Sequence, residues 1–356
     1  MSRWRRLPRR WKFLISLLTV LALVAGPVAV TTGFLAYRFN DLVGRDDVLG
    51  EAAALPAITE KPEYTSWLRR SSSSAPPVVP GAAAAAARNV LVLGVDTRKG
   101  WTAGQSRSDT IMLVHVDGTG SAASVVSIPR DSYVFVPPVA GRWAGGKTKI
   151  NSAYAWGGAP LVVQVVSHLT GLRIDHVVRV DFAGIRTITD VVGGVDVTVA
   201  RTVHDKRTGV TFRAGKHHLD GRLAEVYVRQ RYGLPNGDFD RVKRQQQYLR
   251  ALARKVTSLG ILTNPIRMDA FVSAIAGSLV VDSGMNLVGM FRDLSGLRPD
   301  DLSFTTLPSD GFVRSPAGTA NRLDPEACAD LFAALHTDTM ESYFVSRPAF
   351  DGTTGA

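Results

Sequence analysis

Short apolar runs separated by turn-forming residues fill the chain from about residue 88 onward. Each run is rich in Val, Ile or Leu and is short enough for a buried strand. The runs predict five strands, at residues 89–96, 110–117, 122–129, 174–182 and 195–199. The Gly-Thr-Gly sequence at 118–120 predicts a tight turn that joins the second strand to the third.

Longer segments with helical spacing alternate with these strands. They predict helices near residues 151–170, 182–191, 238–259, 264–277 and 284–296. Such alternation is typical of an α/β domain with a mixed β-sheet flanked by helices on both faces. Residues 321–344 predict at most a short helix, whose Leu331, Phe332 and Leu335 are expected to dock on the core.

The N-terminal region predicts a membrane anchor. Residues 13–37 carry no charge over 25 positions, which at about 1.5 Å per residue spans a hydrocarbon core of about 30 Å. Six cations precede this run and charges of both signs follow it, so residues 1–12 are expected in the cytoplasm and the rest outside. A cleaved signal peptide is the alternative, but its apolar region is usually about 7 to 15 residues long. We therefore expect a single-pass protein of the cell membrane with an extracytoplasmic domain.

A spacer is predicted between the anchor and the folded part. Residues 38–88 include the sequence SSSSAPPVVPGAAAAAA, in which Ser, Pro and Ala dominate and apolar periodicity is absent. This composition is typical of a linker. The remaining chain then divides into one folded domain at 89–345 and a disordered tail at 346–356.

Charge and cysteine content exclude several functions. The formal net charge is +11, but it falls to +5 without the six cations that precede the anchor. The remaining charge is spread among segments of mixed sign, which argues against a nucleic-acid partner. Cys328 is the only cysteine in the sequence, so neither an intramolecular disulfide nor a cysteine-based metal cluster can form.

Charged residues follow or precede the first three strands at one predicted end of the sheet. If these strands are consecutive antiparallel neighbours, Asp96, Asp109 and Arg130 lie together. Two carboxylates offer the hard oxygen ligands that Mg²⁺ takes alongside the oxygens of a phosphate substrate. The alternative is a solvated loop with ordinary surface ion pairs.

Residues 227–247 gather five cations against two carboxylates, and this segment favours the phosphate interpretation. Arg229 and Arg231 project to one side if the backbone there is extended. On the helix that follows, Asp238, Arg241 and Gln245 share a stripe. Guanidinium groups bind phosphate oxygens in bidentate fashion and stay charged, so the set favours a pyrophosphate ligand. Arg–Asp pairs that merely fix a helix are the structural alternative, and they leave several of these arginines unpaired.

Six sequence motifs, in this order, resemble those of the LytR-CpsA-Psr family of cell-envelope proteins, in its actinobacterial form. The motifs are VLGVDTR (92–98), SRSDTIMLVHV (106–116), VVSIPRDSYV (125–134), KINSAYAWGG (149–158), TDVVGGVDV (189–197) and YVRQRYGLPNGDFDRVKRQQ (227–246). Any one of them is a weak signal. The resemblance covers residues 89 to about 260, and six motifs in order, behind a predicted anchor and spacer, argue against a chance match.

The resemblance implies a phosphotransferase that moves a glycopolymer from an undecaprenyl- or decaprenyl-pyrophosphate carrier to a sugar hydroxyl of peptidoglycan. It implies that Asp96 and Asp109 bind Mg²⁺ and that Arg98 lies near the head group. The implied pyrophosphate-binding and catalytic set is Arg107, Arg130, Arg229, Arg231, Arg241 and Gln245. One departure is Glu225, which stands where relatives commonly have Leu.

Several alternatives stay open from the residues alone. Water in place of the sugar hydroxyl would make the protein a polyprenyl-pyrophosphate hydrolase, and binding without turnover would make it an envelope regulator. Asp131, Asp238 and Asp109 are candidate general bases, and the sequence does not rank them. The apolar segments 161–169, 271–281 and 285–291 either line a cavity for the lipid tail or belong to an ordinary core.

Overall fold

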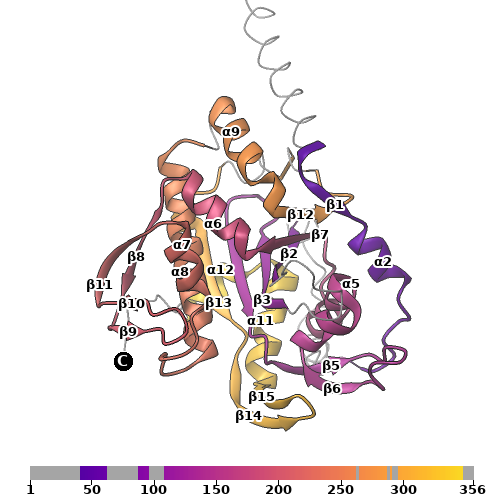
Figure 1. The fold of residues 1–356 in the computed structure, drawn as a ribbon. Coiled ribbons are helices and arrows are strands. Elements are labelled where there is room, and N and C mark those ends of the chain that lie inside the picture. The colour runs from indigo at the N-terminus through magenta and orange to yellow at the C-terminus, as the bar shows by residue number, and fades with distance from the viewer. Residues whose placement is uncertain are drawn as a thin grey trace, which may run out of the picture.

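A seven-stranded mixed sheet organises the part of the chain that the computed structural model describes (Figure 1). The described residues are 41–61, 87–95, 108–261, 264–286, 289–290 and 296–347. The strand order is β1 (Gly44–Asp46), β12 (Leu279–Asp282), β7 (His176–Asp181), β2 (Arg88–Val95), β3 (Ser108–Val116), β4 (Ala123–Ile128) and β13 (Leu302–Thr306). The strands β2, β3 and β4 are consecutive antiparallel neighbours, as the sequence predicted. Their pairing brings the end of β2, the start of β3 and the end of β4 to one edge.

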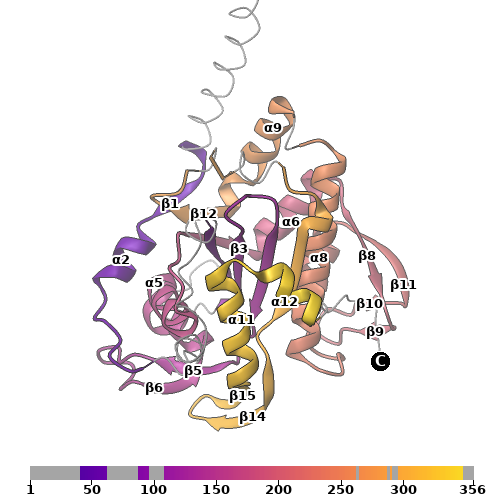
Figure 2. The ribbon, with the colours of Figure 1, turned by 180° about the vertical axis from the view of Figure 1, so that it is seen from behind.

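Helices cover both faces of this sheet, which confirms the predicted mixed α/β architecture. One face carries α6 (Phe182–Val191), α7 (Gly221–Arg229), α8 (Asp238–Ser258), α9 (Pro265–Ile275) and the short 3₁₀ turn at Ala276–Ser278. The other carries α5 (Asn151–Thr170), which is kinked at Gly158, α11 (Pro325–Thr337), α12 (Met340–Ser346) and the small helix α2 (Val48–Ala54). In Figure 1, α6 and α7 lie in front of the sheet. Figure 2 views the molecule from behind, and there α11 and α12 lie in front of the sheet.

Alternation along the strands explains why both faces are covered. Leu91 and Leu93 of β2 point into the core cluster that contains α5 and α11. Met112 of β3 points the other way and packs with Phe304 near Leu249 of α8. Because β2, β3 and β4 carry buried apolar residues on both sides, the centre of the sheet is buried on both faces.

Four short two-stranded ribbons surround the central sheet. They pair β5 (Tyr133–Val136) with β6 (Gly146–Lys149), β8 (Val195–Val199) with β11 (Gly215–Leu219), β9 (Val203–His204) with β10 (Thr211–Phe212), and β14 (Ser309–Ser315) with β15 (Gly318–Leu323). The predicted strand at 195–199 therefore exists, but it pairs outside the central sheet. A further 3₁₀ turn, Pro299–Asp301, precedes β13.

Residues predicted as linker contribute two elements to the fold. Within 38–88, β1 adds a parallel strand to the edge of the sheet beside β12, and α2 packs against α5. Val48 of α2 is buried in the same core cluster as α5. The composition of the neighbouring Ser-, Pro- and Ala-rich stretch hid these short elements, because a three-residue strand carries little periodicity of its own.

Other predictions lie wholly or partly outside the described residues. The anchor at 13–37 and the tail from 348 onward are outside, as is most of the helix predicted at 284–296. Among the helices that the structure describes, none has both the length and the apolar character needed to cross a bilayer. The apolar segments 161–169 and 271–281 belong to core clusters on opposite faces of the sheet.

The predicted docking of the C-terminal helix is confirmed, and it gives a stability test. Leu331 in α11 is fully buried, and Leu331→Ala is expected to lower the free energy of unfolding by about 2 to 5 kcal/mol, because the lost contacts leave a cavity. Urea denaturation of the full chain would measure the change. Val345→Ala is the control, since that side chain on α12 is 80% exposed and should change stability by less than about 0.5 kcal/mol.

Candidate functional site

A β-bulge places Asp109 at the edge of the sheet. Gly94 pairs with Thr110 and Val95 pairs with Ser108, so Asp109 is the extra residue of β3 in this register. The Ser108 hydroxyl spans the bulge by donating to the backbone oxygen of Thr110 at 2.9 Å. Bulges re-aim side chains and interrupt the ladder, and here the bulge turns a strand residue into a site residue.

Arg130 and Arg241 converge on the bulged residue from two other elements. Arg130 follows β4, and its Nη1 donates to a carboxylate oxygen of Asp109. Arg241 lies in the first turn of α8, and its Nη2 donates to the backbone oxygen of Asp109 at 3.0 Å. The bulge therefore leaves a carbonyl outside the ladder, and a buried arginine satisfies it.

Three further charged groups complete the arrangement. Asp238, the first residue of α8, has Oδ1 2.6 Å from Arg241 Nη2 and 3.9 Å from Arg130 Nε. Asp131 lies 3.9 Å from Arg130 Nε and 3.1 Å from Lys149 Nζ. We call this set the Asp–Arg cluster: Asp109, Arg130, Asp131, Lys149, Asp238 and Arg241.

Burial and neighbouring charges shift the ionisation of the cluster. Burial acts to lower the pKa of Arg130, but the three carboxylates around it outweigh burial and raise that pKa. Burial raises the pKa of Asp238, although Arg241 and Arg130 oppose the rise. Oδ2 of Asp238 is buried and receives no hydrogen bond from the residues that the structure describes. The cluster thus holds a carboxylate that takes up a proton more readily than an exposed aspartate.

Arg229 and Arg231 lie beside the cluster in a conformation that differs from the prediction. The extended backbone expected at Arg229 is wrong, because α7 continues to Arg229 and ends there, and the chain becomes extended at Gln230. Arg229 Nη1 donates to Glu225 Oε1, one helical turn earlier, at 2.5 Å, and its guanidinium lies 4.2 Å from the centre of the Phe182 ring. Arg231 follows the helix, and its Nη2 lies 3.4 Å from the hydroxyl of Tyr232.

The other polar residues of the arginine-rich segment fasten helices to each other. Gln245 is buried, and its amide nitrogen donates to the backbone oxygen of Val228 at 3.2 Å, so this donor is used within the fold. Arg244 is buried against the Tyr227 ring at 4.5 Å and donates to Gln230. These contacts tie α8 to α7 and to the residues that follow it.

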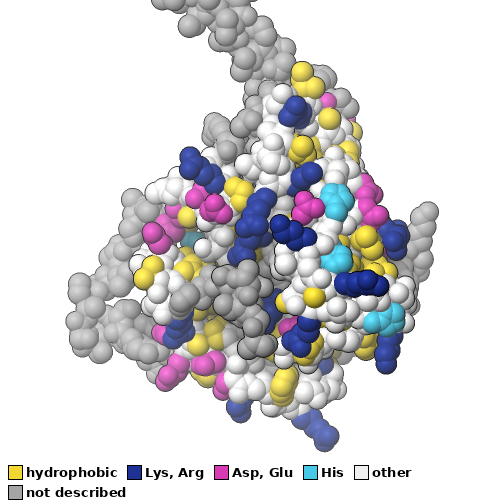
Figure 3. All heavy atoms as spheres, turned by 90° about the vertical axis from the view of Figure 1, so that its left-hand side faces the viewer, with side chains coloured by type: hydrophobic (Ala, Val, Ile, Leu, Met, Phe, Trp, Pro, Cys, Tyr) yellow, Lys and Arg dark blue, Asp and Glu magenta, His cyan; other side chains and the backbone are white. Residues whose placement is uncertain are grey.

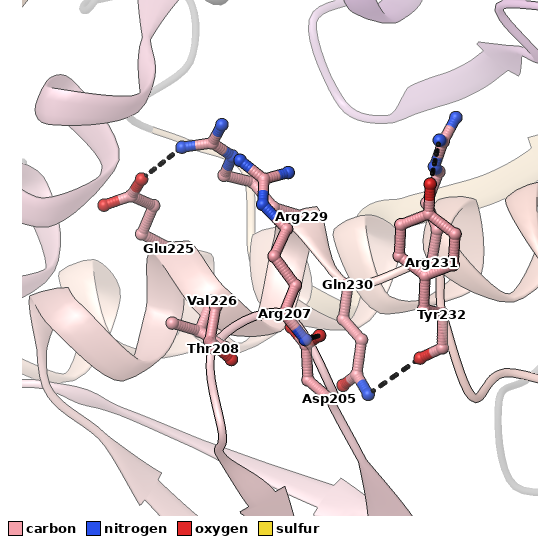
Figure 4. A pocket seen from close by; sticks show the side chains of 9 residues that line it. All are labelled: Asp205, Arg207, Thr208, Glu225, Val226, Arg229, Gln230, Arg231 and Tyr232. Atoms are coloured by element: carbon pink, nitrogen blue, oxygen red, sulfur yellow. Dashed lines mark hydrogen bonds and ion pairs between the residues drawn. The ribbon is translucent and has the colours of Figure 1, made fainter.

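An open pocket lies next to Arg229 and Arg231. Its lining comes from α7, from the residues just after α7, and from the loop between β9 and β10 (Figure 4). The lining residues are Asp205, Arg207, Thr208, Glu225, Val226, Arg229, Gln230, Arg231 and Tyr232. Figure 3 views the molecule from the side that carries β8 to β11, where Lys and Arg side chains are spread among Asp and Glu.

The order and content of these elements match a known family. The profile of the LytR_cpsA_psr family matches residues 59–326. The chain belongs to the LytR-CpsA-Psr family.

Similar proteins include a cell wall biosynthesis protein and a teichoic acid transferase. The cell wall biosynthesis protein LcpA of Corynebacterium glutamicum is 34% identical over 268 residues, which are 68% of this chain and 50% of LcpA. The chain therefore spans about half the length of that relative. The polyisoprenyl-teichoic acid–peptidoglycan teichoic acid transferase TagU of Enterococcus faecalis is 32% identical over 228 residues, 63% of this chain and 72% of TagU. A solved structure of TagT bound to LI-WTA is similar with a TM-score of 0.56 and 26% identity, over 71% of this chain and 91% of TagT.

Three of the residues to which the LytR-CpsA-Psr resemblance gives a role lie outside the described part of the chain. They are Asp96, Arg98 and Arg107, all between β2 and β3. Asp109, Arg130 and Arg241 are brought together, whereas Arg229 and Arg231 line the adjoining pocket. No group of three or more His, Cys, Asp or Glu that could hold a metal occurs among the described residues.

Sequence reasoning missed two features of the site in this LytR-CpsA-Psr protein. The bulge at Asp109 was not predicted, although a glycine inside a strand, here Gly94, is a signal for a bulge or a close backbone approach. A Cβ at Gly94 would lie 2.7 Å from the Cβ of Thr110. The partners of Glu225 were also missed: this buried carboxylate contacts both Arg229 and Arg186. Its place where relatives commonly have Leu was the available signal.

Proposed function

We propose that this protein transfers a glycopolymer from a polyprenyl-pyrophosphate carrier to a sugar hydroxyl of peptidoglycan during cell-wall assembly. The observation that carries the proposal is the convergence of Arg130 and Arg241 on Asp109 at one edge of the sheet. The family membership of this chain and its similarity to TagU, a named teichoic acid transferase, support the same reaction.

The two arginines are suited to hold the transferring phosphoryl group. Attack by a hydroxyl oxygen on the glycan-linked phosphorus forms a new phosphorus–oxygen bond and breaks the bond to polyprenyl phosphate. Negative charge on the phosphoryl oxygens must be held during this displacement, and fixed cations in a partly buried site do this without reorganising. Arg130 and Arg241 are already oriented by Asp109 and Asp238, so little side-chain entropy is lost when substrate binds.

Asp238 is the group best placed to take the proton of the attacking hydroxyl. Its side chain is 13% exposed, and its Oδ2 has no hydrogen-bond donor among the described residues. Burial raises its pKa, which makes it a stronger base than an exposed aspartate. The proton leaves the acceptor oxygen as that oxygen bonds to phosphorus.

We also propose that Asp109 and Asp96 bind a magnesium ion. The donor set fits in type, since carboxylate oxygens are the ligands Mg²⁺ prefers, and Asp109 is 22% exposed at the edge of the cluster. When bound there, the ion would neutralise charge on the pyrophosphate. Arg130 also contacts Asp109, so ion and arginine would share this carboxylate.

The membrane location of the donor fits the predicted anchor. A polyprenyl carrier stays in the bilayer, and a helix at 13–37 would keep the domain near it on the extracytoplasmic side. This location belongs to the proposal, as does the use of peptidoglycan as acceptor.

Incubation of the detergent-solubilised full chain with a short-chain polyprenyl-pyrophosphate disaccharide and peptidoglycan fragments tests the proposal. Mass spectrometry should find the disaccharide joined to peptidoglycan through a phosphodiester, with polyprenyl phosphate released in equal amount. Free phosphorylated disaccharide without the joined product would instead indicate a hydrolase. Binding without turnover would indicate a regulator, and either result would overturn the proposal.

A further inference from the structure

One wall of the pocket beside Arg229 lies outside all six of the family motifs. This wall is the loop between β9 and β10, which contributes Asp205, Arg207 and Thr208. In Figure 4, Arg207 and Arg229 extend toward the same side of the pocket, and Arg231 and Tyr232 extend together on its other side. Three arginines, Arg207 from the loop and Arg229 and Arg231 from the end of α7 and the residues after it, thus line one open pocket.

The loop is fixed by its own hydrogen bonds, so Arg207 is presented from an ordered turn. Asp205 is buried, and its Oδ1 accepts from the backbone nitrogen of Arg207 at 2.9 Å. The backbone nitrogen of Asp205 donates to Val210 at 2.8 Å across the loop. Gly233, with φ of 80°, lets the chain after Tyr232 pass close to β9, since a Cβ there would lie 2.7 Å from the His204 oxygen.

The charges of the pocket favour an anion. Glu225 is committed to Arg229 and Arg186, and Asp205 is committed to the loop backbone. The guanidinium of Arg207 makes no ion pair with a residue that the structure describes, and it is exposed. Tyr232 is 57% exposed, with the Arg231 guanidinium 5.4 Å from the centre of its ring, and the exposed part of the ring offers a flat apolar surface to a sugar.

We propose that this pocket is a subsite for an anionic group, a phosphate or a carboxylate, on the glycan of the donor, with Arg207 as the residue that selects for it. Arg207 and Arg229 bind the anionic oxygens from one side, and Tyr232 supports the sugar ring that carries them. The inference rests on the proposed function and deepens it, because it assigns the donor a charged glycan.

The position of the pocket explains why the donor is the partner. Arg231 lines the pocket and also acts on the pKa of Asp238, so it stands between the pocket and the Asp–Arg cluster. In the proposed reaction, a glycan attached to a pyrophosphate in the cluster would extend toward the pocket at Arg231.

Steady-state kinetics of the full chain with three matched donors tests the subsite. The donors are short-chain polyprenyl-pyrophosphate disaccharides that carry a neutral sugar, a glycerol phosphate or a uronic acid at the second position. Arg207→Ala is expected to raise KM about tenfold for at least one charged donor, because it removes a charge-assisted hydrogen bond. The rise for the neutral donor should be at least fivefold smaller. The charged donor whose KM rises, the glycerol phosphate or the uronic acid, identifies the anion as a phosphate or a carboxylate.

Lys206→Ala is the matched control, because it removes a cation from the same loop without altering the lining of the pocket. The subsite is rejected if Arg207→Ala and Lys206→Ala have equal effects on all three donors while the wild-type protein turns them over. The subsite is also rejected if the effect of Arg207→Ala on KM changes when the carboxylates of the peptidoglycan acceptor are amidated but does not change with the charge of the donor. Failure of the wild-type protein to turn over any donor would reject the proposed function itself.

Discussion

Arg130→Ala is expected to lower kcat for glycan transfer by about 100- to 1,000-fold, the usual effect of removing one preorganised donor to a developing anionic charge. Arg130 is the centre of the Asp–Arg cluster, because it contacts Asp109 and lies 3.9 Å from both Asp131 and Asp238. Without it, three carboxylates face the phosphoryl group with fewer cations to balance them. Single-turnover measurements with the disaccharide donor would separate this loss in the chemical step from any change in donor binding.

Two further variants give this result a specific meaning. Arg130→Lys keeps the charge but loses the planar, bidentate donor geometry, so it is expected to recover only part of the rate. Arg201→Ala removes an exposed arginine after β8 and should leave kcat within about twofold of wild type. Thermal melts of each variant show whether the protein remains folded. A folded Arg130→Ala protein with nearly wild-type kcat would remove Arg130 from the catalytic role.

The main elements of the fold were predictable because their patterns are strong. The strands β2, β3 and β4 are short apolar runs, β3 and β4 have a clear turn signal between them, and α5 and α8 are long enough for helical periodicity to show. The short helix α7 was missed, although Asp220 caps it by accepting from the backbone nitrogen of Leu223. Two-residue strands such as β9 and β10 carry no pattern that a sequence could reveal.

The site was predictable where it depends on strand order and not where it depends on side-chain partners. Consecutive antiparallel strands brought Asp109 and Arg130 to one edge, as the sequence indicated. The sequence could not say that Arg241 enters the cluster while Arg244, three residues later, is buried against Tyr227. Both are arginines three positions apart on one helix and lie only about 60° apart around its axis. Helical spacing alone therefore does not distinguish them, and only the packing of α8 does.

The charges of the Asp–Arg cluster are paired with one another within the fold. Its three carboxylates and three cations balance one another, so the arginines are paired before substrate arrives. In the proposed reaction, the pyrophosphate competes with Asp109 and Asp238 for the guanidinium groups. If Asp109 and Asp96 hold Mg²⁺ as proposed, Asp109 would share its charge between the ion and Arg130, and donor affinity is expected to depend on Mg²⁺.

Asp238→Asn is expected to lower kcat by about 100- to 10,000-fold, the range for loss of a general base. The amide keeps the size of the side chain but cannot take the proton of the acceptor hydroxyl. The wild-type rate should fall at acid pH as Asp238 becomes protonated, and this fall should begin at a higher pH than for an ordinary aspartate, because burial raises the pKa of Asp238. The rate of Asp238→Asn, measured from pH 4 to pH 9, should lack that acid limb.

Asp240→Asn provides the matched comparison for this result. Asp240 lies in the same first turn of α8 and carries the same charge near the helix N-terminus, but its carboxylate accepts from Asn236 at 3.0 and 3.1 Å. Its loss should therefore leave both kcat and the acid limb close to wild type. If Asp238→Asn retained the acid limb with only a lowered plateau, Asp238 would be a positioning residue for Arg241, and the base would have to be another group. A pH profile thus distinguishes proton transfer from charge balance at a carboxylate that performs both in the proposed reaction.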